Sequence, residues 1–439
     1  GNIYAILAGT GALTKSGAGT TTLTNANTYS GGTTVNAGTL TLSGSGTLGS
    51  TSGALNIAGG TVNLGGLTRT NGAFTMSSGT LTNGTLNASS YSLTSSGTVS
   101  AVLAGTGALT STGFGVTLSG ANTYSGGTTI NSGLLGISNN AAFGTGAVTF
   151  ASNSTVWVVN NLNVTNAYSI ATGAQGTFNV GSGLTLTNTG VISGAGSLRL
   201  TQPGTLQLTA ANTYSGGTTV DSGTLVLSGS GTMGVTNGDL AITGGTVNLG
   251  GLTRTNGALL ITVGALTNGT MNASSVTLSN AVSTTGRVDA VLAGTSAVSK
   301  IGVGATIFTV GNTYTGGTTV SEGTITLQGA ATFGATNGAL TIAGGTVDLG
   351  GNSLGAQTRT NGVFTMGTGT LTNGTLNASS YALTNAGNIY AILAGSGALT
   401  KSGAGTATLT NANTYSGGTT VNAGTLALSG SGTLGATTG

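Results

Sequence analysis

The amino-acid sequence predicts an all-β fold, a parallel β-helix (β-solenoid) made of repeats of about 95 residues. Three observations predict it. Apolar and polar residues alternate in short runs, glycine and asparagine punctuate these runs, and long segments recur almost unchanged along the 439 residues. Repeated units that each bury a face on the next unit are typical of a solenoid.

Short strands with one buried face are expected wherever apolar residues stand at every second position. Examples are the segments 39–43, 54–58, 61–64, 73–76 and 80–83. Thr and Val, which suit pleated strands, are frequent here, and no stretch has the Ala, Leu, Glu and Lys content of a stable helix. We therefore expect almost no helix.

Tight bends are expected at Asn-Gly dipeptides between the strands, since both residues tolerate a positive φ. These dipeptides are Asn71-Gly72, Asn83-Gly84, Asn256-Gly257 and Asn373-Gly374. The strands between such bends would follow one another at intervals of about 8–12 residues.

A β-sandwich or barrel would give the same local pattern, and two features favour a solenoid instead. Single β-sandwich or barrel domains rarely exceed about 250 residues, whereas this pattern continues without interruption. Near-identical units also stack easily, each burying its neighbour's face. With turns of roughly 20 residues, the chain would form about 20 turns, four or five in each repeat.

One nine-residue string marks the repeats at intervals of 95, 90, 100 and 101 residues. It reads NTYSGGTTV, with single changes in two copies, and begins at Asn27, Asn122, Asn212, Asn312 and Asn413. The repeat units are accordingly placed, within one continuous solenoid of residues 1–439, at about 27–121, 122–211, 212–311, 312–412 and 413–439.

Two further strings recur between these markers. GGTVNLGG begins at Gly59 and Gly244 and, with Asp for Asn, at Gly344. TRTNG begins at Thr68, Thr253 and Thr358.

Two segments depart from the repeat pattern. An insert at Asn352–Gln357 delays the third TRTNG, and the region Asn139–Gly204, which holds Trp157, diverges most. By contrast, residues 1–50 and 387–436 differ at four positions. This return to the starting register indicates a fragment of a longer array.

Composition narrows the function classes. The chain has 85 Gly, no Cys, no His and 3% charged residues, against about 25% charged residues in ordinary soluble domains. Its eight Lys and Arg are dispersed, so there is no basic patch for nucleic acid. Without Cys there are no disulfides or thiolate metal sites, and no apolar run reaches the ~18 residues of a membrane helix. We expect no cofactor, no nucleic-acid partner and no transmembrane segment.

The segment Ala26–Leu40, ANTYSGGTTVNAGTL, resembles the autotransporter-associated β-strand repeat, also called the passenger-associated transport repeat. The flanking Gly/Thr/Asn-rich sequence is similar to the same family, so the resemblance covers essentially the whole chain. It implies a bacterial surface or secreted passenger, usually a right-handed parallel β-helix, involved in adhesion, aggregation or cell-surface structure. The family supplies no catalytic residues.

The arginines of the TRTNG strings are the candidates for ligand contact. A row of Arg69, Arg254 and Arg359 would attract an acidic glycan or lipopolysaccharide. The alternative is a residue at a bend that packs its stem over the turn below. Because the copies are several turns apart, we favour the structural alternative.

The marker strings supply structural candidates. We expect their tyrosines to fill a corner of the core beside the Gly-Gly bend, with the hydroxyl group hydrogen-bonded; a carbohydrate-stacking surface is the alternative. The tyrosines are Tyr29, Tyr124, Tyr214, Tyr314 and Tyr415. The first glycines of the adjoining bends are Gly31, Gly126, Gly216, Gly316 and Gly417.

Acidic residues are the remaining candidates for chemistry. Asp221 and Asp239 would fall on neighbouring turns, and hydrolases need such paired carboxylates. Asp348, in a Gly-rich string, would suit calcium. Other repeats carry Asn at the positions of Asp221 and Asp348, and this exchange indicates turn chemistry. We therefore expect neither an enzyme nor a metal site.

Thr runs such as 20–24 would suit ice binding, but Thr ladders explain them equally well.

We expect an extracellular or cell-surface structural protein that forms a fibre or filament by end-to-end or lateral self-association. A nearly uncharged surface offers little repulsion between copies. The alternative is an adhesin passenger that binds host cells or surface glycans through the divergent region 139–204 or the insert 352–357. A polysaccharide-active enzyme is a distant third interpretation.

Overall fold

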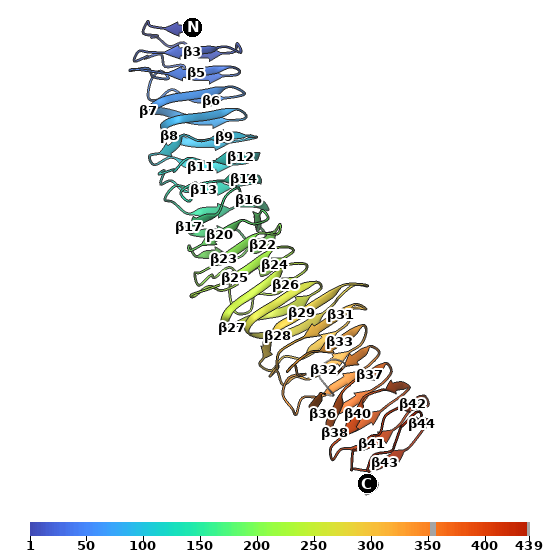
Figure 1. The fold of residues 1–439 in the computed structure, drawn as a ribbon. Helices are drawn as coiled ribbons and strands as arrows, with labels where there is room; N and C mark the ends of the chain where they lie inside the picture. The colour runs from blue at the N-terminus through green and yellow to red at the C-terminus, as the bar shows by residue number, and fades with distance from the viewer. Residues whose placement is uncertain (352–356, 437–439) are drawn as a thin grey trace. The chain divides into compact units, whose positions relative to one another are not determined.

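The protein is a parallel β-solenoid. The computed structural model describes residues 1–351 and 357–436, and the 44 elements assigned there are all strands. Strands pair in parallel with those of the next turn, and the chain makes about 21 turns of about 20 residues. Figure 1 shows the strands of successive turns one after another within each part of the chain. The predictions of an all-β parallel solenoid and of turns of roughly 20 residues are confirmed, and the described residues contain no helix, as expected.

The chain divides into two compact units, which we describe separately. The first comprises Gly1–Thr218 and Leu227–Val235, and the second Thr219–Val226 and Thr236–Gly439.

The strands of the first unit are short apart from β7 and β8. They are β1 (Asn2–Ile3), β2 (Leu13–Lys15), β3 (Thr20–Leu23), β4 (Thr33–Val35), β5 (Thr39–Leu42), β6 (Leu55–Ile57), β7 (Thr61–Met76), β8 (Thr80–Leu93), β9 (Gly97–Val99), β10 (Val102–Ala104), β11 (Ala108–Ser111), β12 (Phe114–Leu118), β13 (Thr128–Ile130), β14 (Gly133–Ile137), β15 (Val148–Phe150), β16 (Ser154–Val158), β17 (Leu162–Val164), β18 (Tyr168–Ile170), β19 (Gln175–Val180), β20 (Thr185–Asn188), β21 (Ile192–Gly194), β22 (Ser197–Thr201) and β23 (Thr205–Leu208). Two strands fall where the units meet in sequence: β24 (Thr218–Val220) and β25 (Thr224–Leu227).

The second unit repeats the pattern, with long strands β27 and β28. Its strands are β26 (Leu240–Ile242), β27 (Thr246–Ile261), β28 (Gly264–Leu278), β29 (Thr285–Ala293), β30 (Val298–Lys300), β31 (Ala305–Phe308), β32 (Thr318–Val320), β33 (Thr324–Leu327), β34 (Leu340–Ile342), β35 (Thr346–Asp348), β36 (Thr358–Met366), β37 (Thr370–Thr372), β38 (Thr375–Leu383), β39 (Gly387–Ile389), β40 (Ile392–Ala394), β41 (Ala398–Lys401), β42 (Thr406–Leu409), β43 (Thr419–Val421) and β44 (Thr425–Leu428).

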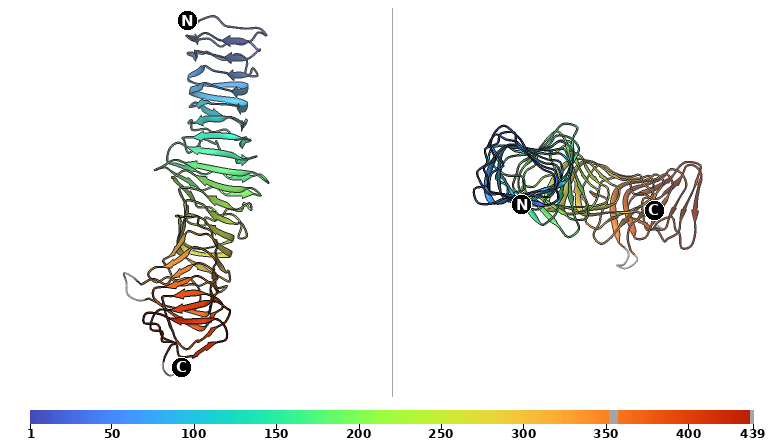
Figure 2. Two further views of the ribbon diagram at one scale, coloured as in Figure 1. Left: turned by 90° about the vertical axis from the view of Figure 1, so that its right-hand side faces the viewer. Right: turned by 90° about the horizontal axis from the view of Figure 1, so that it is seen from above.

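Inward side chains stack in columns because each residue pairs with its counterpart on the next turn. In the first unit one column runs through Leu55, Phe74, Tyr91 and Leu109, all at most 1% exposed. The rings of Phe74 and Tyr91 meet edge-on, with centroids 6.2 Å apart. Full burial of each such side chain stabilises the fold by about 1.5–3 kcal/mol. The turns enclose this core, as the view from above shows for the first unit in blue and green (Figure 2).

Two of the predicted Asn-Gly bends are present and two are not. Asn83 and Asn373 have φ of 55° and 56°, the left-handed conformation that lets the chain turn there. Asn71 and Asn256 do not have a positive φ and continue β7 and β27, so the prediction of a bend there was wrong.

Close approach of the backbone explains the glycine at 72. A Cβ on this residue would lie 2.3 Å from the carbonyl oxygen of Ser52 on the preceding turn. Its neighbour Asn71 is 3% exposed and donates to the carbonyl groups of Leu48 and Gly53. The dipeptide therefore serves contact between turns rather than a change of direction.

The asparagine that opens each marker string joins three successive turns. Asn122, which is 2% exposed, accepts from the Leu103 N–H at 2.8 Å and donates to the Ala142 carbonyl at 2.6 Å. Leu103 lies one turn earlier and Ala142 one turn later. The side chain thus satisfies backbone groups where no strand ladder does so. The same two bonds are made by Asn27, Asn212, Asn312 and Asn413.

Replacement of this asparagine should destabilise the first unit. In Asn122→Ala the Leu103 amide and the Ala142 carbonyl lose their partner, at about 1–3 kcal/mol each. We expect a lower denaturant midpoint and faster hydrogen exchange at the Leu103 amide. The matched control is Asn131→Ala at an exposed side chain, where the change should stay within about 0.5 kcal/mol. Equal effects of the two substitutions would contradict the role given to Asn122.

Candidate binding surface

The five tyrosines of the marker strings are core residues. Their exposed fractions are 0–3%, and each hydroxyl oxygen lies 2.5–2.7 Å from the Oγ1 of the threonine four residues later. These threonines are Thr33, Thr128, Thr218, Thr318 and Thr419. Thr33 itself stands in an inward column between Leu13 and Leu55, where the tyrosine hydroxyl compensates for its burial. Stacking of a carbohydrate would require exposed rings.

The marker glycines are required by the backbone. On the first glycine of each pair a Cβ would lie 2.4–2.6 Å from backbone atoms of the preceding turn; these residues are Gly31, Gly126, Gly216, Gly316 and Gly417. The second glycine of each pair has φ between 79° and 83°, which other residues rarely adopt. In the Gly-Gly bend, the first glycine therefore allows the backbones of two turns to approach closely, and the second adopts the positive φ that the bend requires.

The three arginines of the TRTNG strings lie in inward columns. On the next turn they pair with fully buried residues, namely Leu86, Met271 and Leu376. Arg359 is 6% exposed, and its Nη2 donates to the Gly329 carbonyl at 2.9 Å. Arg69 and Arg254 are half-buried. Burial lowers the pKa of all three guanidinium groups. This placement favours the structural interpretation over a row of cations for an acidic ligand.

Three buried lysines were not singled out by the sequence. Lys15, Lys300 and Lys401 are 0–9% exposed. The Nζ of Lys401 donates to the carbonyl groups of Ser402 and Gly403 at 2.8 and 2.7 Å, and the Lys300 ammonium donates to Gly302. Burial lowers the pKa of Lys300, an effect that Glu322 partly offsets. The signal was present, because each lysine occupies the inward position of a Leu-x-Lys or Val-x-Lys run.

Asp348 is a turn residue. Its Oδ1 accepts from the Gly350 N–H at 2.9 Å and from the Asn373 Nδ2 at 2.8 Å. Asn248, its counterpart, accepts the same two bonds, both at 2.9 Å, from Gly250 and Asn268. An amide oxygen and a carboxylate oxygen are interchangeable in this role because both only accept.

The other acidic residues have separate partners. Asp221 accepts from the Thr243 hydroxyl at 2.6 Å, and Asp239 accepts from the Ala258 N–H at 2.8 Å. Asp289 forms an ion pair with Arg287 at 2.5 Å. Within residues 1–351 and 357–436 no three metal-binding side chains gather into a cluster.

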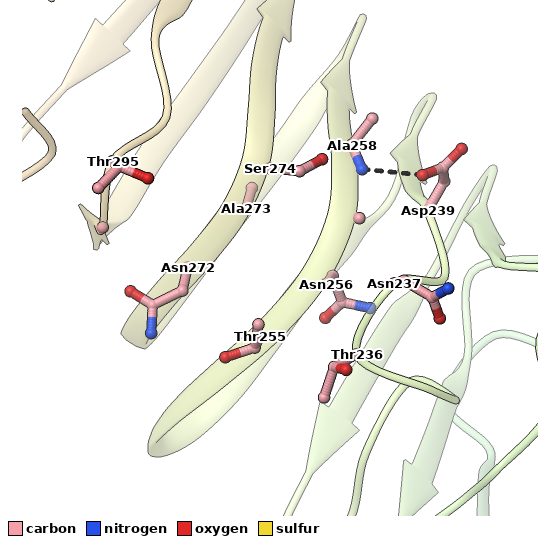
Figure 3. A pocket seen from close by; sticks show the side chains of 12 residues that line it. Thr236, Asn237, Asp239, Thr255, Asn256, Ala258, Asn272, Ala273, Ser274 and Thr295 are labelled. Atoms are coloured by element: carbon pink, nitrogen blue, oxygen red, sulfur yellow. Dashed lines mark hydrogen bonds between the residues drawn. The ribbon is translucent and has the colours of Figure 1, made fainter. Parts of the chain in front are cut away.

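Shallow grooves lined by Asn, Ser, Thr, Gly and Ala residues, among others, open on the surface at three equivalent places in the repeats, and we call them the corner grooves. The groove of the first unit is about 470 Å³ in volume and is lined by Ser52, Thr70, Asn71, Asn87, Ser89 and Thr106, among others. The first groove of the second unit, shown in Figure 3, measures about 420 Å³ and is lined by Asn237, Thr255, Asn256, Asn272, Ser274 and Thr295. The other groove of that unit measures about 490 Å³ and includes Asn337, Thr360, Asn361, Asn377, Ser379 and Ser396.

Each corner groove holds one half-buried asparagine whose amide makes no hydrogen bond to another described residue: Asn87, Asn272 and Asn377. Behind them, Asn71 and Asn361 are 3% exposed, and their Oδ1 atoms have no partner among the residues that the structure describes. Sequence reasoning missed these grooves, although the string Asn-Ala-Ser-Ser recurs in all three. Their lining residues come from different turns and are separated by nearly twenty positions.

The divergent region Asn139–Gly204 lies within the first unit and carries an exposed tryptophan. Trp157 in β16 is 38% exposed and covers Gly136 of the preceding turn, where a Cβ would lie 3.3 Å from the indole ring. The insert Asn352–Gln357, the second region proposed for binding, lies outside the described residues except for Gln357.

Five segments of the chain match a known family of repeats. The Passenger-associated-transport-repeat family matches residues 13–42, 116–137, 198–227, 298–327 and 399–428. Each match contains one marker string and ends at the last residue of the strand that follows it. The chain thus carries repeats of this family, as the sequence predicted.

One relative is distantly similar. The chain is 30% identical over 173 residues to a protein named adhesin BmaC autotransporter from Brucella suis biovar 1 (strain 1330). The match covers 38% of this chain and 5% of the relative. No solved structure matches the chain. In the residues that the structure describes, no helix has the length and apolarity to cross a membrane.

Stability should fall at alkaline pH. Burial raises the pKa of all five marker tyrosines, whereas tyrosines of the unfolded chain ionise near pH 10. Their contribution is therefore fully present below about pH 10 and is lost as the pH rises further, by up to about 1.4 kcal/mol per pH unit for each tyrosine. Denaturant midpoints from pH 8 to 12 test this. A flat profile above pH 10 would be inconsistent with ionisation being coupled to unfolding.

Exchange of Asp and Asn at the GGTV(N/D)LGG string should be nearly neutral. Asp348→Asn keeps the accepting oxygen, so stability should change by less than about 0.5 kcal/mol. Asn248→Ala removes it and should cost about 1–2 kcal/mol. Thermal unfolding with and without calcium measures both. A calcium-dependent rise in melting temperature that Asp348→Asn abolishes would show that Asp348 is a ligand instead.

Proposed function

We propose that this chain is part of the exported passenger of a bacterial autotransporter and acts in adhesion of the cell to a host surface. The observation that carries the proposal is the set of five passenger-associated-transport repeats together with the similarity to an adhesin autotransporter. The same similarity supports a secreted or cell-surface location. The match spans about 5% of the relative's length.

The surface chemistry supports a binding role without catalysis. The exposed side chains are mainly Thr, Ser and Asn, Asp221, Asp239 and Asp348 accept hydrogen bonds from separate partners, and the chain has no histidine. Such a surface offers many weak hydrogen-bonding groups and few groups that could transfer a proton at neutral pH.

Self-association into fibres, the interpretation that the sequence favoured, is the second candidate. The low charge content of 3% supports it, because little repulsion opposes contact between copies. Adhesion is placed first because the relative is an adhesin by name. Light scattering separates the two: fibres require particle size to grow with protein concentration in the absence of any ligand.

Adhesion is tested with the purified chain coupled to beads. Chain-coated beads should bind cultured epithelial cells at least several-fold better than albumin-coated beads, and soluble chain should compete. Binding no stronger than that of the albumin beads would refute the proposal. Preparations that scatter as large particles are removed first, so that adhesion is measured separately from self-association.

A further inference from the structure

We propose that the three corner grooves are equivalent subsites for an uncharged glycan chain. The inference rests on the proposed adhesive function and names the ligand class and the place of contact. Four features of the structure support this proposal: the shape of the grooves, their unpaired polar groups, their charge, and the paired state of the strands beneath them.

The shape suits an extended chain. In the first unit the lining residues Ser52, Thr70, Asn87 and Thr106 come from four successive turns. At ~4.8 Å per turn, the groove extends for roughly 14 Å along the turns. Small residues make it concave: Gly72 lies against the turn before, and Ala88 on the floor is 6% exposed. A linear ligand would therefore lie across the turns rather than along a strand.

The polar groups suit sugar hydroxyls. A hydroxyl both donates and accepts, and so does the side-chain amide of Asn87, which has no partner in the described chain. The exposed hydroxyl groups of Thr70 and Ser89 flank it. The second unit presents the same set twice, around Asn272 and Asn377. Between these groups the methyl groups of Ala88, Ala273 and Ala378 offer apolar contact for the C–H faces of a sugar ring.

The charge of the grooves favours a neutral ligand. No Lys or Arg lines any of the three grooves, and the nearest arginines in sequence lie in inward columns. In the groove of Figure 3, Asp239 supplies a carboxylate that bonds the Ala258 N–H, as the dashed line shows. A polyanion would meet no cation in any groove and a carboxylate in this one.

The strands beneath the grooves leave no place for a peptide to pair. Extended peptides bind by adding a strand to an open sheet edge. At the first groove, β7 pairs with β6 and β8, and β8 pairs with β10 and β11. Because these backbone groups are already engaged, recognition falls to side chains, and side-chain amides and hydroxyls favour a glycan over a peptide.

Repetition compensates for the shallowness of each groove. The two grooves of the second unit are 105 residues apart at Thr255 and Thr360, or about five turns, which is ~24 Å along the unit. A polysaccharide that engages one groove stays near the next, so its overall binding exceeds that of a single subsite. Short oligosaccharides should bind this chain far more weakly than long ones.

The test is affinity electrophoresis of the whole chain in gels that contain a single soluble polysaccharide. The neutral probes are dextran, mannan and galactan, and the anionic probes are polygalacturonate and heparin. The groove variant combines Asn87→Ala, Asn272→Ala and Asn377→Ala. The matched control combines Thr82→Ala, Thr267→Ala and Thr372→Ala, which lie on the same turns beyond the Asn-Gly bend. Circular dichroism and melting curves establish that both variants fold.

We expect at least one neutral polysaccharide to retard the wild-type chain and the control variant alike. The groove variant should lose at least tenfold in apparent affinity, and Asn87→Ala alone should lose less. Absence of retardation by all three neutral probes, retardation by the anionic probes alone, or equal retardation of the groove and control variants would overturn the proposal.

The cell-adhesion assay distinguishes failure of the groove proposal from failure of the proposed adhesive function. If beads that carry the groove variant still bind cells, the chain is adhesive but the corner grooves are not the site of adhesion, and the glycan proposal fails as the explanation of adhesion. In that case Trp157→Ala tests whether contact lies in the divergent region instead. Loss of adhesion in the groove variant, together with loss of neutral polysaccharide binding, supports both proposals.

Discussion

The structure depends on one constraint: nearly every backbone hydrogen bond between strands runs from one turn to the next. Each turn must therefore offer its acceptors at the height where the following turn offers its donors, including at the bends, where no ladder exists. The marker asparagines meet this requirement with a side chain that accepts from the turn before and donates to the turn after. The Gly-Gly bend allows the same turns to approach closely. The repeated string is thus a device for keeping turns in register, and its recurrence follows from that task.

Much of the fold could be predicted from the sequence because its signal is local. Alternation along five residues is enough to assign a strand and its inward face, and the repeats showed that the strands stack. Handedness and the division into repeats of about 95 residues stay predictions. The Asn-Gly signal was less specific: at Asn83 it marks a bend, whereas at Asn71 it marks close contact between two turns. The dipeptide is identical, and only the neighbouring turn distinguishes the two roles.

The candidate site was harder to predict because it is assembled across turns. Asn87 and Thr70 are 17 positions apart in sequence and become neighbours only once the register is known. The arginines of TRTNG drew attention as charges in an uncharged chain, yet alternation places them inward beneath Leu86 and its counterparts. Alternation likewise places the lysines inward, and carbonyl groups of the two residues that follow it in the chain, Ser402 and Gly403, accept from Lys401.

The two near-identical 50-residue segments, 1–50 and 387–436, wind in the same way, so the gene encodes nearly the same stretch of protein twice. Leu13 pairs with Thr33 and Leu399 with Thr419, so both segments wind with the same number of residues per turn. Unequal recombination between their coding sequences would delete or duplicate a whole number of turns and leave every remaining hydrogen bond intact. The solenoid would therefore lengthen or shorten by whole turns while its pairing from turn to turn is kept.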